Sequence, residues 1–282
     1  MTEAFCPGHV TCFFHPVRTD DPVTTGSRGA GLRLSLGTKV ILEERSDSRL
    51  NIVMDGAEAE APVTRRVLEL ICPSRGFDIT IENDLPVAQG FGMSASGAIA
   101  AALCACSISG IDISEAYRYA HVAEVVCGGG LGDVSAIMSD VHQPVRVKPG
   151  LPPYGRVEGT GLRFDRLTLA VTGTKLSTAP VISDPVIQRR MNEIGSRMVD
   201  EYFERPSVES LFSYSREFSS SVGLESEDVK EALKKLGGNA GMCMLGHSIF
   251  TTVPEDEVRD ILGDVPVFTV STSDRPAFIQ RA

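Results

Sequence analysis

The segment Leu85–Ala98, which reads Leu-Pro-Val-Ala-Gln-Gly-Phe-Gly-Met-Ser-Ala-Ser-Gly-Ala, leads from a loop rich in glycine and serine into a run of small helix formers that ends at Cys106. Glycine lets a backbone approach a ligand closely, and the first turn of a helix offers unpaired N–H groups at the positive end of its dipole. This combination favours a phosphate site, in which Ser94 and Ser96 would cap the helix or face a metal ion. The segment therefore predicts where a nucleotide binds.

Two common phosphate loops do not account for this segment. A Walker A loop is excluded because the chain contains no Gly-Lys dipeptide. The Rossmann spacing fits only loosely, since Ala95 would have to act as the third small residue and the next acidic residue is Asp112, at the start of a helix. A phosphate cradle of another type remains, beside the alternative that the glycines serve only close packing.

Three segments resemble the motifs of the GHMP kinases, in the same order and across nearly the whole chain. The central segment is similar to the family's Pro-x-x-x-Gly-Leu-Gly-Ser-Ser-Ala pattern, with Met93 in place of the first serine and Ser94 matching the second. Cys6–Val10 is similar to the N-terminal Ala-Pro-Gly-Lys/Arg-Val motif, and Leu236–Cys243 is similar to the C-terminal glycine-rich loop. The resemblance implies that ATP is the phosphate donor and that its phosphates are held by Pro86, Gly90, Gly92, Ser94, Ala95, Ser96 and Gly97.

Within that family, Pro7–Phe14 and Gly26–Gly31 are most similar to the archaeal pantoate kinases. The implied reaction is phosphorylation of (R)-pantoate by ATP to 4-phosphopantoate, on the archaeal route to coenzyme A. Two other functions stay open. One is a GHMP kinase for another small hydroxylated substrate, such as homoserine, shikimate or mevalonate, and the other is a catalytically silent ligand sensor on the same fold.

The predicted magnesium site consists of one carboxylate and one hydroxyl. Mg²⁺ prefers oxygen ligands and keeps several waters, so two protein groups are enough. The resemblance implies that Glu124 and Ser94 bind Mg²⁺ beside ATP. The alternative for Glu124 is a solvated glutamate on a helix face, although its neighbours Ala123 and Val125 make this turn unusually apolar.

Asp133 is the predicted catalytic base. It follows the glycine-rich stretch 128–132, where an aspartate often caps the next helix. The resemblance implies instead that Asp133 orients or deprotonates the substrate hydroxyl. Asp133, Glu124 and Ser94 together form the predicted catalytic set.

A small hydroxy acid needs an arginine and several polar donors around it. The predicted substrate contacts are Ser27 and Arg28, in an expected glycine-rich loop, together with His121, Arg146 and His9. His121 shares a helix face with Glu124, three residues away. His9 stands where many relatives carry Lys or Arg, so it is expected to contact substrate or to be structural. Val10, Phe13 and Phe14 are expected to form an apolar wall for the two methyl groups of pantoate.

The composition limits the classes of partner. The formal net charge of −10 argues against a general nucleic-acid surface and means that an anionic substrate depends on local positive groups. No apolar run is long enough to cross a membrane, and the N-terminus lacks a signal pattern. The seven cysteines include no Cys-x-x-Cys pair, which predicts reduced thiols in a cytoplasmic protein. A homodimer is expected only by analogy with relatives.

Periodicity and breaker residues predict an α+β fold. The resemblance implies a ribosomal S5 domain 2-like N-terminal domain over residues 1–150 and a ferredoxin-like C-terminal domain over residues 151–282, with the junction in the segment 144–159, which is rich in proline and glycine. Strands are expected at 31–43, 50–54, 77–81, 167–173, 242–253 and 265–271, and helices at 61–71, 96–109, 114–127, from 185, from about 206, 228–236 and 254–262.

Overall fold

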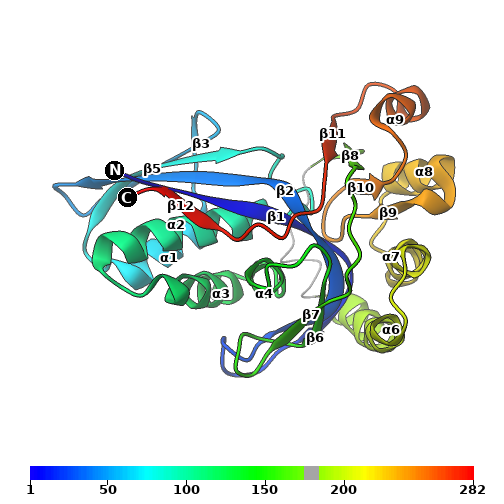
Figure 1. Ribbon diagram of the computed structural model, residues 1–282, viewed down its shortest axis with the longest axis horizontal. Helices are drawn as coiled ribbons and strands as arrows, with labels where there is room; N and C mark the ends of the chain where they lie inside the picture. The colour runs from blue at the N-terminus through cyan, green and yellow to red at the C-terminus, as the bar shows by residue number, and fades with distance from the viewer. Residues whose placement is uncertain (175–183) are drawn as a thin grey trace.

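Two β-sheets organise the chain in the computed structural model, which describes residues 1–174 and 184–282 (Figure 1). The larger sheet has eight strands and the smaller has four. Helices cover one face of the larger sheet and pack beside the smaller one, which confirms the expected α+β class.

The larger sheet is built around a long antiparallel pair, β1 (Thr2–Val17) and β2 (Gly26–Arg45). Its strand order is β12-β1-β2-β5-β3-β4. A hairpin of β6 and β7 extends the sheet, because β6 pairs with the N-terminal part of β2. Because β12 pairs with β1, the two ends of the chain lie side by side (Figure 1). The remaining strands are β3 (Leu50–Met54), β4 (Ala57–Glu58), β5 (Gly76–Asn83), β6 (Pro144–Lys148), β7 (Arg156–Gly159) and β12 (Phe278–Arg281).

Helix α2 (Met93–Ser109) lies at the centre of the helical layer on this sheet. It is apolar all round and almost wholly buried, as its run of alanines requires. Small side chains let it approach both β1 and β2, while neighbouring helices cover its flanks. These neighbours are α1 (Pro62–Ile71), the 3-10 turn Ile113–Glu115, α3 (Ala116–Val126) and α4 (Asp133–Met138).

The smaller sheet has the strand order β11-β8-β10-β9 and is antiparallel throughout. Its strands are β8 (Leu167–Val171), β9 (Ala240–Met242), β10 (Ser248–Thr251) and β11 (Val267–Val270). The helices beside it are α6 (Pro185–Glu204), α7 (Val208–Val222), α8 (Glu227–Leu236) and α9 (Glu255–Leu262), with a 3-10 turn at Gly237–Asn239. Helix α6 also crosses onto β1, where Gly195 lies so close to the Phe14 carbonyl that a Cβ would sit 2.2 Å from its oxygen.

Several local expectations need correction. Ser27 and Arg28 lie in strand β2, which begins at Gly26, and not in a loop. The helix expected from Ser114 begins at Ala116, and Asp112 is the residue that caps the preceding turn by accepting a hydrogen bond from the Ser114 N–H. The strand expected at 242–253 is two short strands separated by a loop at 243–247. The segment 144–159 contains the β6–β7 hairpin; the expected domain limits stay a prediction.

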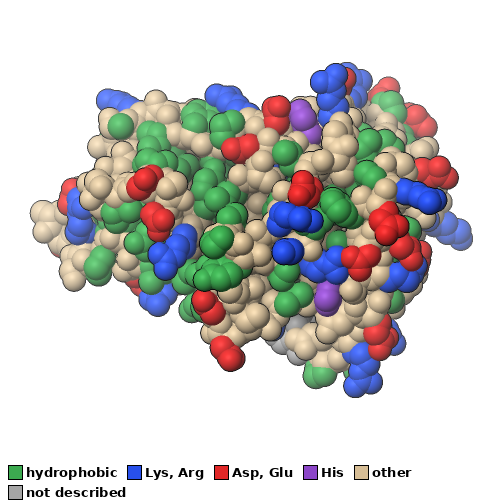
Figure 2. Space-filling view, turned by 60° about the horizontal axis from the view of Figure 1, so that its bottom comes forward, with side chains coloured by type: hydrophobic (Ala, Val, Ile, Leu, Met, Phe, Trp, Pro, Cys, Tyr) green, Lys and Arg blue, Asp and Glu red, His purple; other side chains and the backbone are tan. Residues whose placement is uncertain are grey.

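The surface carries charges of both signs. Figure 2 shows acidic and basic side chains intermingled over the face in view. Within the described residues, no helix is both long enough and apolar enough to cross a membrane. All seven cysteines are free thiols, and six of them are buried.

Candidate active site

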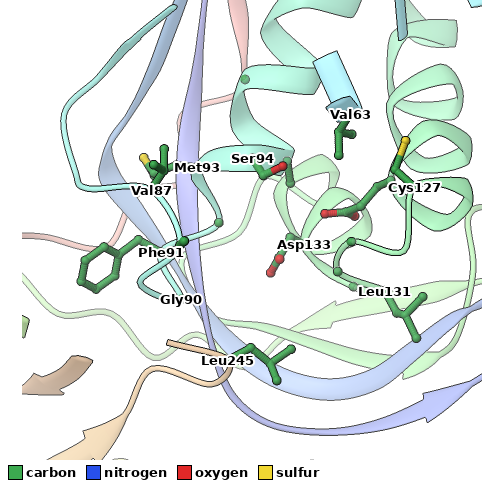
Figure 3. Close-up of a pocket in the computed structure, with 18 of the residues that line it drawn as sticks. Val63, Val87, Gly90, Phe91, Met93, Ser94, Cys127, Leu131, Asp133 and Leu245 are labelled. Carbon is green, nitrogen blue, oxygen red and sulfur yellow. The ribbon is translucent and has the colours of Figure 1, made fainter. Parts of the chain in front are cut away.

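A cavity of about 510 Å³ lies where four segments meet: the loop 85–92, the start of α2, the glycine-rich loop 128–132 before α4, and the loop 243–247. We call the loop 85–92 the phosphate loop, after its predicted role. Figure 3 shows Ser94 and Asp133 in the same space, with Val63 and Cys127 towards one end and Leu245 towards the other. The lining residues are Thr11, Phe14, Ser27, Met54, Ala59, Ala61–Thr64, Ile81, Val87, Ala88, Gly90–Ala95, Gly97, Glu124, Cys127–Asp133, Arg146, Met244 and Leu245.

The phosphate loop presents backbone to this cavity. Gly90 and Gly92 have φ angles of 77° and 71°, a left-handed conformation that favours glycine. Gly92 is the N-cap of α2, and within the described residues no side chain caps this helix. The first-turn N–H groups of α2 are therefore available to an anion at the positive end of the helix dipole.

The two serines of the loop have different roles. Ser94 is exposed and lines the cavity, as expected of a ligand-binding residue. Ser96 is buried, and its hydroxyl donates to the Pro7 carbonyl at 2.7 Å and to the Gly92 carbonyl at 3.0 Å. Neither serine caps α2, and Ser96 instead fastens the helix to strand β1. Of the other residues expected around the phosphates, Pro86 does not line the cavity, whereas Gly90, Gly92, Ala95 and Gly97 do.

Glu124 is a buried carboxylate without a full set of partners. It is only 1 % exposed, and its Oε2 atom has no hydrogen-bond partner among residues 1–174 and 184–282. Burial raises the pKa of Glu124 well above its usual range, and the charge of nearby Asp133 adds to this effect, while Arg146 opposes it. Such an unpaired buried oxygen, facing a cavity that Ser94 also lines, fits the oxygen-rich ligand set of Mg²⁺.

Asp133 and Glu124 flank Gly130. A Cβ placed on Gly130 would lie 2.8 Å from Asp133 Oδ2 and 3.0 Å from Glu124 Oε1, so the two carboxylates meet across this glycine. No group of three or more His, Cys, Asp or Glu side chains able to hold a metal gathers in the described chain. A cation here would thus depend on oxygen atoms of a bound ligand as well as on the protein.

Asp133 is held by a histidine from strand β1. His9 Nδ1 lies 2.7 Å from Asp133 Oδ1, and the His9 side chain is fully buried while that of Asp133 is 24 % exposed. Burial lowers the pKa of His9, so the imidazole is neutral near pH 7 and donates its Nδ1–H to the ionised carboxylate. Burial alone would raise the pKa of Asp133, but the hydrogen bond from His9 and the charge of Arg146 hold it below its usual value. Asp133 is therefore ionised and oriented.

His9 also joins Asp133 to the phosphate loop. Its backbone N–H donates to the Phe91 carbonyl at 3.0 Å, and its ring packs so closely on Gly31 that a Cβ there would lie 2.2 Å from Nε2. The His9 side chain lies beneath the cavity and is not part of its lining. The geometry thus makes His9 a support for Asp133.

Arg146, from strand β6, is a buried cation with free donors. It is 1 % exposed, and Nε and Nη1 find no acceptor in the part of the chain that the structure describes. Its remaining contact is a hydrogen bond of 3.5 Å from Nη2 to the Thr11 hydroxyl. Ser27 lies beside it, since a Cβ on Gly132 would touch both Ser27 Oγ and Arg146 Nε. A buried guanidinium with two such unpartnered nitrogen atoms can bind a carboxylate or a phosphate.

The other expected substrate residues lie outside this cavity. His121 is buried, and its Nε2 lies 2.9 Å from the Thr25 carbonyl oxygen. Arg28 pairs with Asp200 on α6 and donates to the Val147 carbonyl at 3.0 Å. Of the expected apolar wall, Phe14 lines the cavity, whereas Val10 and Phe13 are core residues.

Sequence reasoning missed three groups of lining residues. Thr11 directly follows the N-terminal motif Cys6–Val10, and no signal in the sequence marked it as a lining residue. Met244 and Leu245 were predicted to lie in a continuous strand. The apolar end of the cavity, formed by Met54, Ala61–Thr64 and Ile81, comes from elements with no motif of their own. These residues meet because β3 pairs with β5 in the sheet, while α1 connects the two strands in the sequence.

Known proteins match this chain over most of its length. The GHMP kinases N terminal domain matches residues 59–140. A pantoate kinase of Thermococcus kodakarensis is 32 % identical over 94 % of this chain and 93 % of its own length. A pantoate kinase of Methanocaldococcus jannaschii is 29 % identical over 92 % of this chain and 95 % of its own length.

Solved structures agree on the fold. One described as a phosphotransferase related to the CoA biosynthesis pathway superposes with a TM-score of 0.86 at 29 % identity, covering 99 % of this chain and 98 % of the other. A galactokinase of Lactococcus lactis superposes with a TM-score of 0.68 at 12 % identity, over 98 % of this chain and 94 % of its own, and this likeness concerns the fold alone.

Proposed function

This chain belongs to the GHMP kinase family, and from that membership we propose that it transfers the γ-phosphoryl group of ATP to the 4-hydroxyl of (R)-pantoate, yielding ADP and 4-phosphopantoate. The observation that supports a hydroxy acid as acceptor is the buried Arg146 guanidinium, whose Nε and Nη1 have no partner among the described residues, in the same cavity as the ionised Asp133. The choice of pantoate among such acids follows from the relatives that are named pantoate kinases. An acceptor that fits both needs a carboxylate at one end and a hydroxyl at the other. Pantoate has this form.

The carboxylate of the acceptor would bind Arg146. Nη2 donates one of its two N–H groups to Thr11, so its other N–H, together with that of Nε or Nη1, can pair with the two oxygens of a carboxylate. Nε and Nη1 have no partner among the described residues, and such a pairing would give one of them an acceptor. Burial lowers the pKa of Arg146, yet its neighbours Asp133 and Glu124 favour the charged form. Burial disfavours the charged guanidinium, and pairing with a carboxylate would offset that penalty.

Asp133 would act on the acceptor hydroxyl. One oxygen, Oδ1, is engaged by His9, while Oδ2 faces Gly130 at the cavity. As the 4-oxygen attacks the γ-phosphorus, the bond from that phosphorus to the ADP oxygen breaks and the hydroxyl proton passes to Asp133. Holding the hydroxyl in line with the phosphate would lower the barrier as well.

The phosphates of ATP would lie on the N-terminus of α2, with the base towards the apolar end near Val63 and Ile81. Glu124 and Ser94 would hold Mg²⁺ beside the phosphates, because their oxygens face the cavity and Glu124 Oε2 has no other partner in the described ranges. When bound, Mg²⁺ supplies positive charge that offsets the charge of the transferred phosphoryl group.

A panel of acceptors tests this proposal. Release of ADP would be measured with pantoate, mevalonate, homoserine and shikimate at equal concentrations. We expect pantoate to give the highest kcat/KM, and turnover of a relative without turnover of pantoate would overturn the choice of substrate. A chain that binds ATP and pantoate but turns over none of the four would be a ligand sensor.

The setting of the reaction follows from the same proposal. The product would enter the synthesis of coenzyme A, as the name of the related phosphotransferase states for that protein. Seven free thiols favour a reducing compartment such as the cytoplasm. A homodimer is proposed by analogy with the family, and light scattering of the purified protein would test it.

A further inference from the structure

Leu245 has a backbone conformation that is rare for its type. Its φ is 63°, in the left-handed region where the Cβ of a branched apolar side chain crowds the backbone. Residues held in this way store strain and gather at functional sites. Leu245 lies in the loop between β9 and β10, at the wall of the cavity.

The surroundings of the loop prevent it from relaxing. The Met244 N–H donates to the Thr11 carbonyl at 3.0 Å, and the Gly246 N–H donates to the Cys243 carbonyl at 3.2 Å. A Cβ on Gly246 would lie 2.1 Å from the Gln89 carbonyl carbon, so this loop is pressed directly against the phosphate loop. The left-handed turn at Leu245 is therefore imposed by its two neighbours in space.

The Leu245 side chain faces the acceptor end of the cavity. Figure 3 shows it below the Asp133 carboxylate and across the space from Val63 and Cys127. The backbone N–H of its neighbour Met244 donates a hydrogen bond to the Thr11 carbonyl, and the Thr11 hydroxyl accepts a hydrogen bond from Arg146. Leu245 thus lines the same cavity as Arg146, which would hold the carboxylate, and Asp133, which would accept the proton.

We propose that Leu245 is a specificity-determining residue, held by its left-handed backbone so that its side chain packs on the branched hydrocarbon part of the acceptor. In pantoate this part is the carbon with two methyl groups, between the carboxylate end and the reacting hydroxyl. Phe14 and Met244 line the same cavity and complete an apolar surface. This inference rests on the proposed function and adds the group that reads the methyl groups.

Pairing variants with substrates isolates this contact. The variants are Leu245→Ala and Leu245→Gly, and the substrates are pantoate and 2,4-dihydroxybutanoate, which keeps both polar ends but lacks the methyl groups. An apolar contact of this size changes kcat/KM about 10- to 100-fold. We expect the preference of the wild type for pantoate to fall by that factor in both variants, with kcat/KM for 2,4-dihydroxybutanoate nearly unchanged.

Two controls separate packing from strain. Leu245→Met keeps an apolar side chain and should keep the preference for pantoate. Ser74→Gly relieves another left-handed residue, with φ 71°, that does not line the cavity, so it should leave the preference unchanged. Leu245→Gly, which relieves the same kind of strain, should fold at least as readily as Leu245→Ala.

The outcomes distinguish this inference from the proposed function. A wild type that turns over pantoate, with Leu245→Ala and Leu245→Gly of unchanged preference, would overturn the role of Leu245 and leave the proposed function standing. A wild type that does not turn over pantoate would overturn both. Equal losses on the two substrates would show that Leu245 supports the phosphate loop and does not read the methyl groups, which also overturns the inference.

Discussion

At the scale of single residues, four ionisable groups at the cavity divide the chemistry between them: Glu124, Asp133, His9 and Arg146. Burial and the negative charge of a neighbour keep the pKa of Glu124 high, whereas His9 and Arg146 hold that of Asp133 low. Environments that shift the pKa values of two neighbouring carboxyl groups in opposite directions suit the two groups to different tasks. Asp133 is ready to accept a proton, and a cation bound beside Glu124 would lower the pKa of this carboxyl group.

The hydrogen bond from His9 sets the lower pH limit of activity. Asp133 acts as a base only when ionised, so activity should be lost as the pH falls through its pKa. His9→Leu removes the donor, which raises the pKa of Asp133 and should move the acidic limb of the kcat/KM profile to higher pH. His142→Leu serves as the control, because His142 is only partly buried and lies outside the cavity lining. An unmoved acidic limb in His9→Leu would contradict the pairing.

Arg146 should matter for binding the acid more than for binding ATP. In Arg146→Gln we expect the KM for pantoate to rise about 100-fold, because charged hydrogen bonds to a carboxylate are lost. Binding of pantoate should also raise the Tm of the wild type by mass action, and this shift should vanish in the variant. A variant with an unchanged KM would place the carboxylate elsewhere.

At the scale of elements, the sequence predicted helices better than it predicted the strands that hold the site. Helix α2 was found because its alanines and the preceding glycines leave one interpretation. Strand β1 was missed as a strand because Pro7, Gly8 and Pro16 interrupt its alternation, and its pairing with β2 is irregular next to His9 and Thr11. These irregularities stand beside the two residues that meet Asp133 and Arg146.

Long-range pairing explains most of what the sequence could not predict. His9 reaches Asp133 across 124 residues of chain, and no local pattern marks that contact. Leu245 was placed in a strand because its neighbours are apolar, while its left-handed turn depends on Gln89 and Thr11. The motif residues were recognisable one by one, but their supports arise only from the tertiary fold.

The contact of α6 with β1 offers a test at this scale. Gly195 allows the helix to approach the Phe14 carbonyl, and a methyl group there would force the two elements apart. Gly195→Ala should lower the free energy of unfolding in urea by about 1–3 kcal/mol. Gly238→Ala is the matched control, since a Cβ at that position meets nothing within 4 Å. Equal stabilities of the two variants would argue against this close packing.

At the scale of the whole molecule, the net charge of −10 opposes the binding of an anionic acceptor. Attraction comes from one buried arginine, which salt screens less than it screens the surface charges. Raising the ionic strength from about 10 to 150 mM should therefore increase kcat/KM for pantoate roughly 2-fold. Steady-state kinetics in a non-coordinating salt would measure this, and a steady fall would mean that surface cations guide the substrate.

The two sheets act together at the cavity. The larger sheet supplies Thr11 and Arg146, and the helices that cover it bear Glu124 and Asp133. The smaller sheet supplies Leu245 through its β9–β10 loop.

Pantoate-dependent release of ADP by Asp133→Ala, with ATP binding measured on the same sample, tests the proposed role of Asp133 most directly. Turnover should fall by about 100-fold or more while the affinity for ATP stays near that of the wild type. Undiminished turnover would remove Asp133 from the reaction.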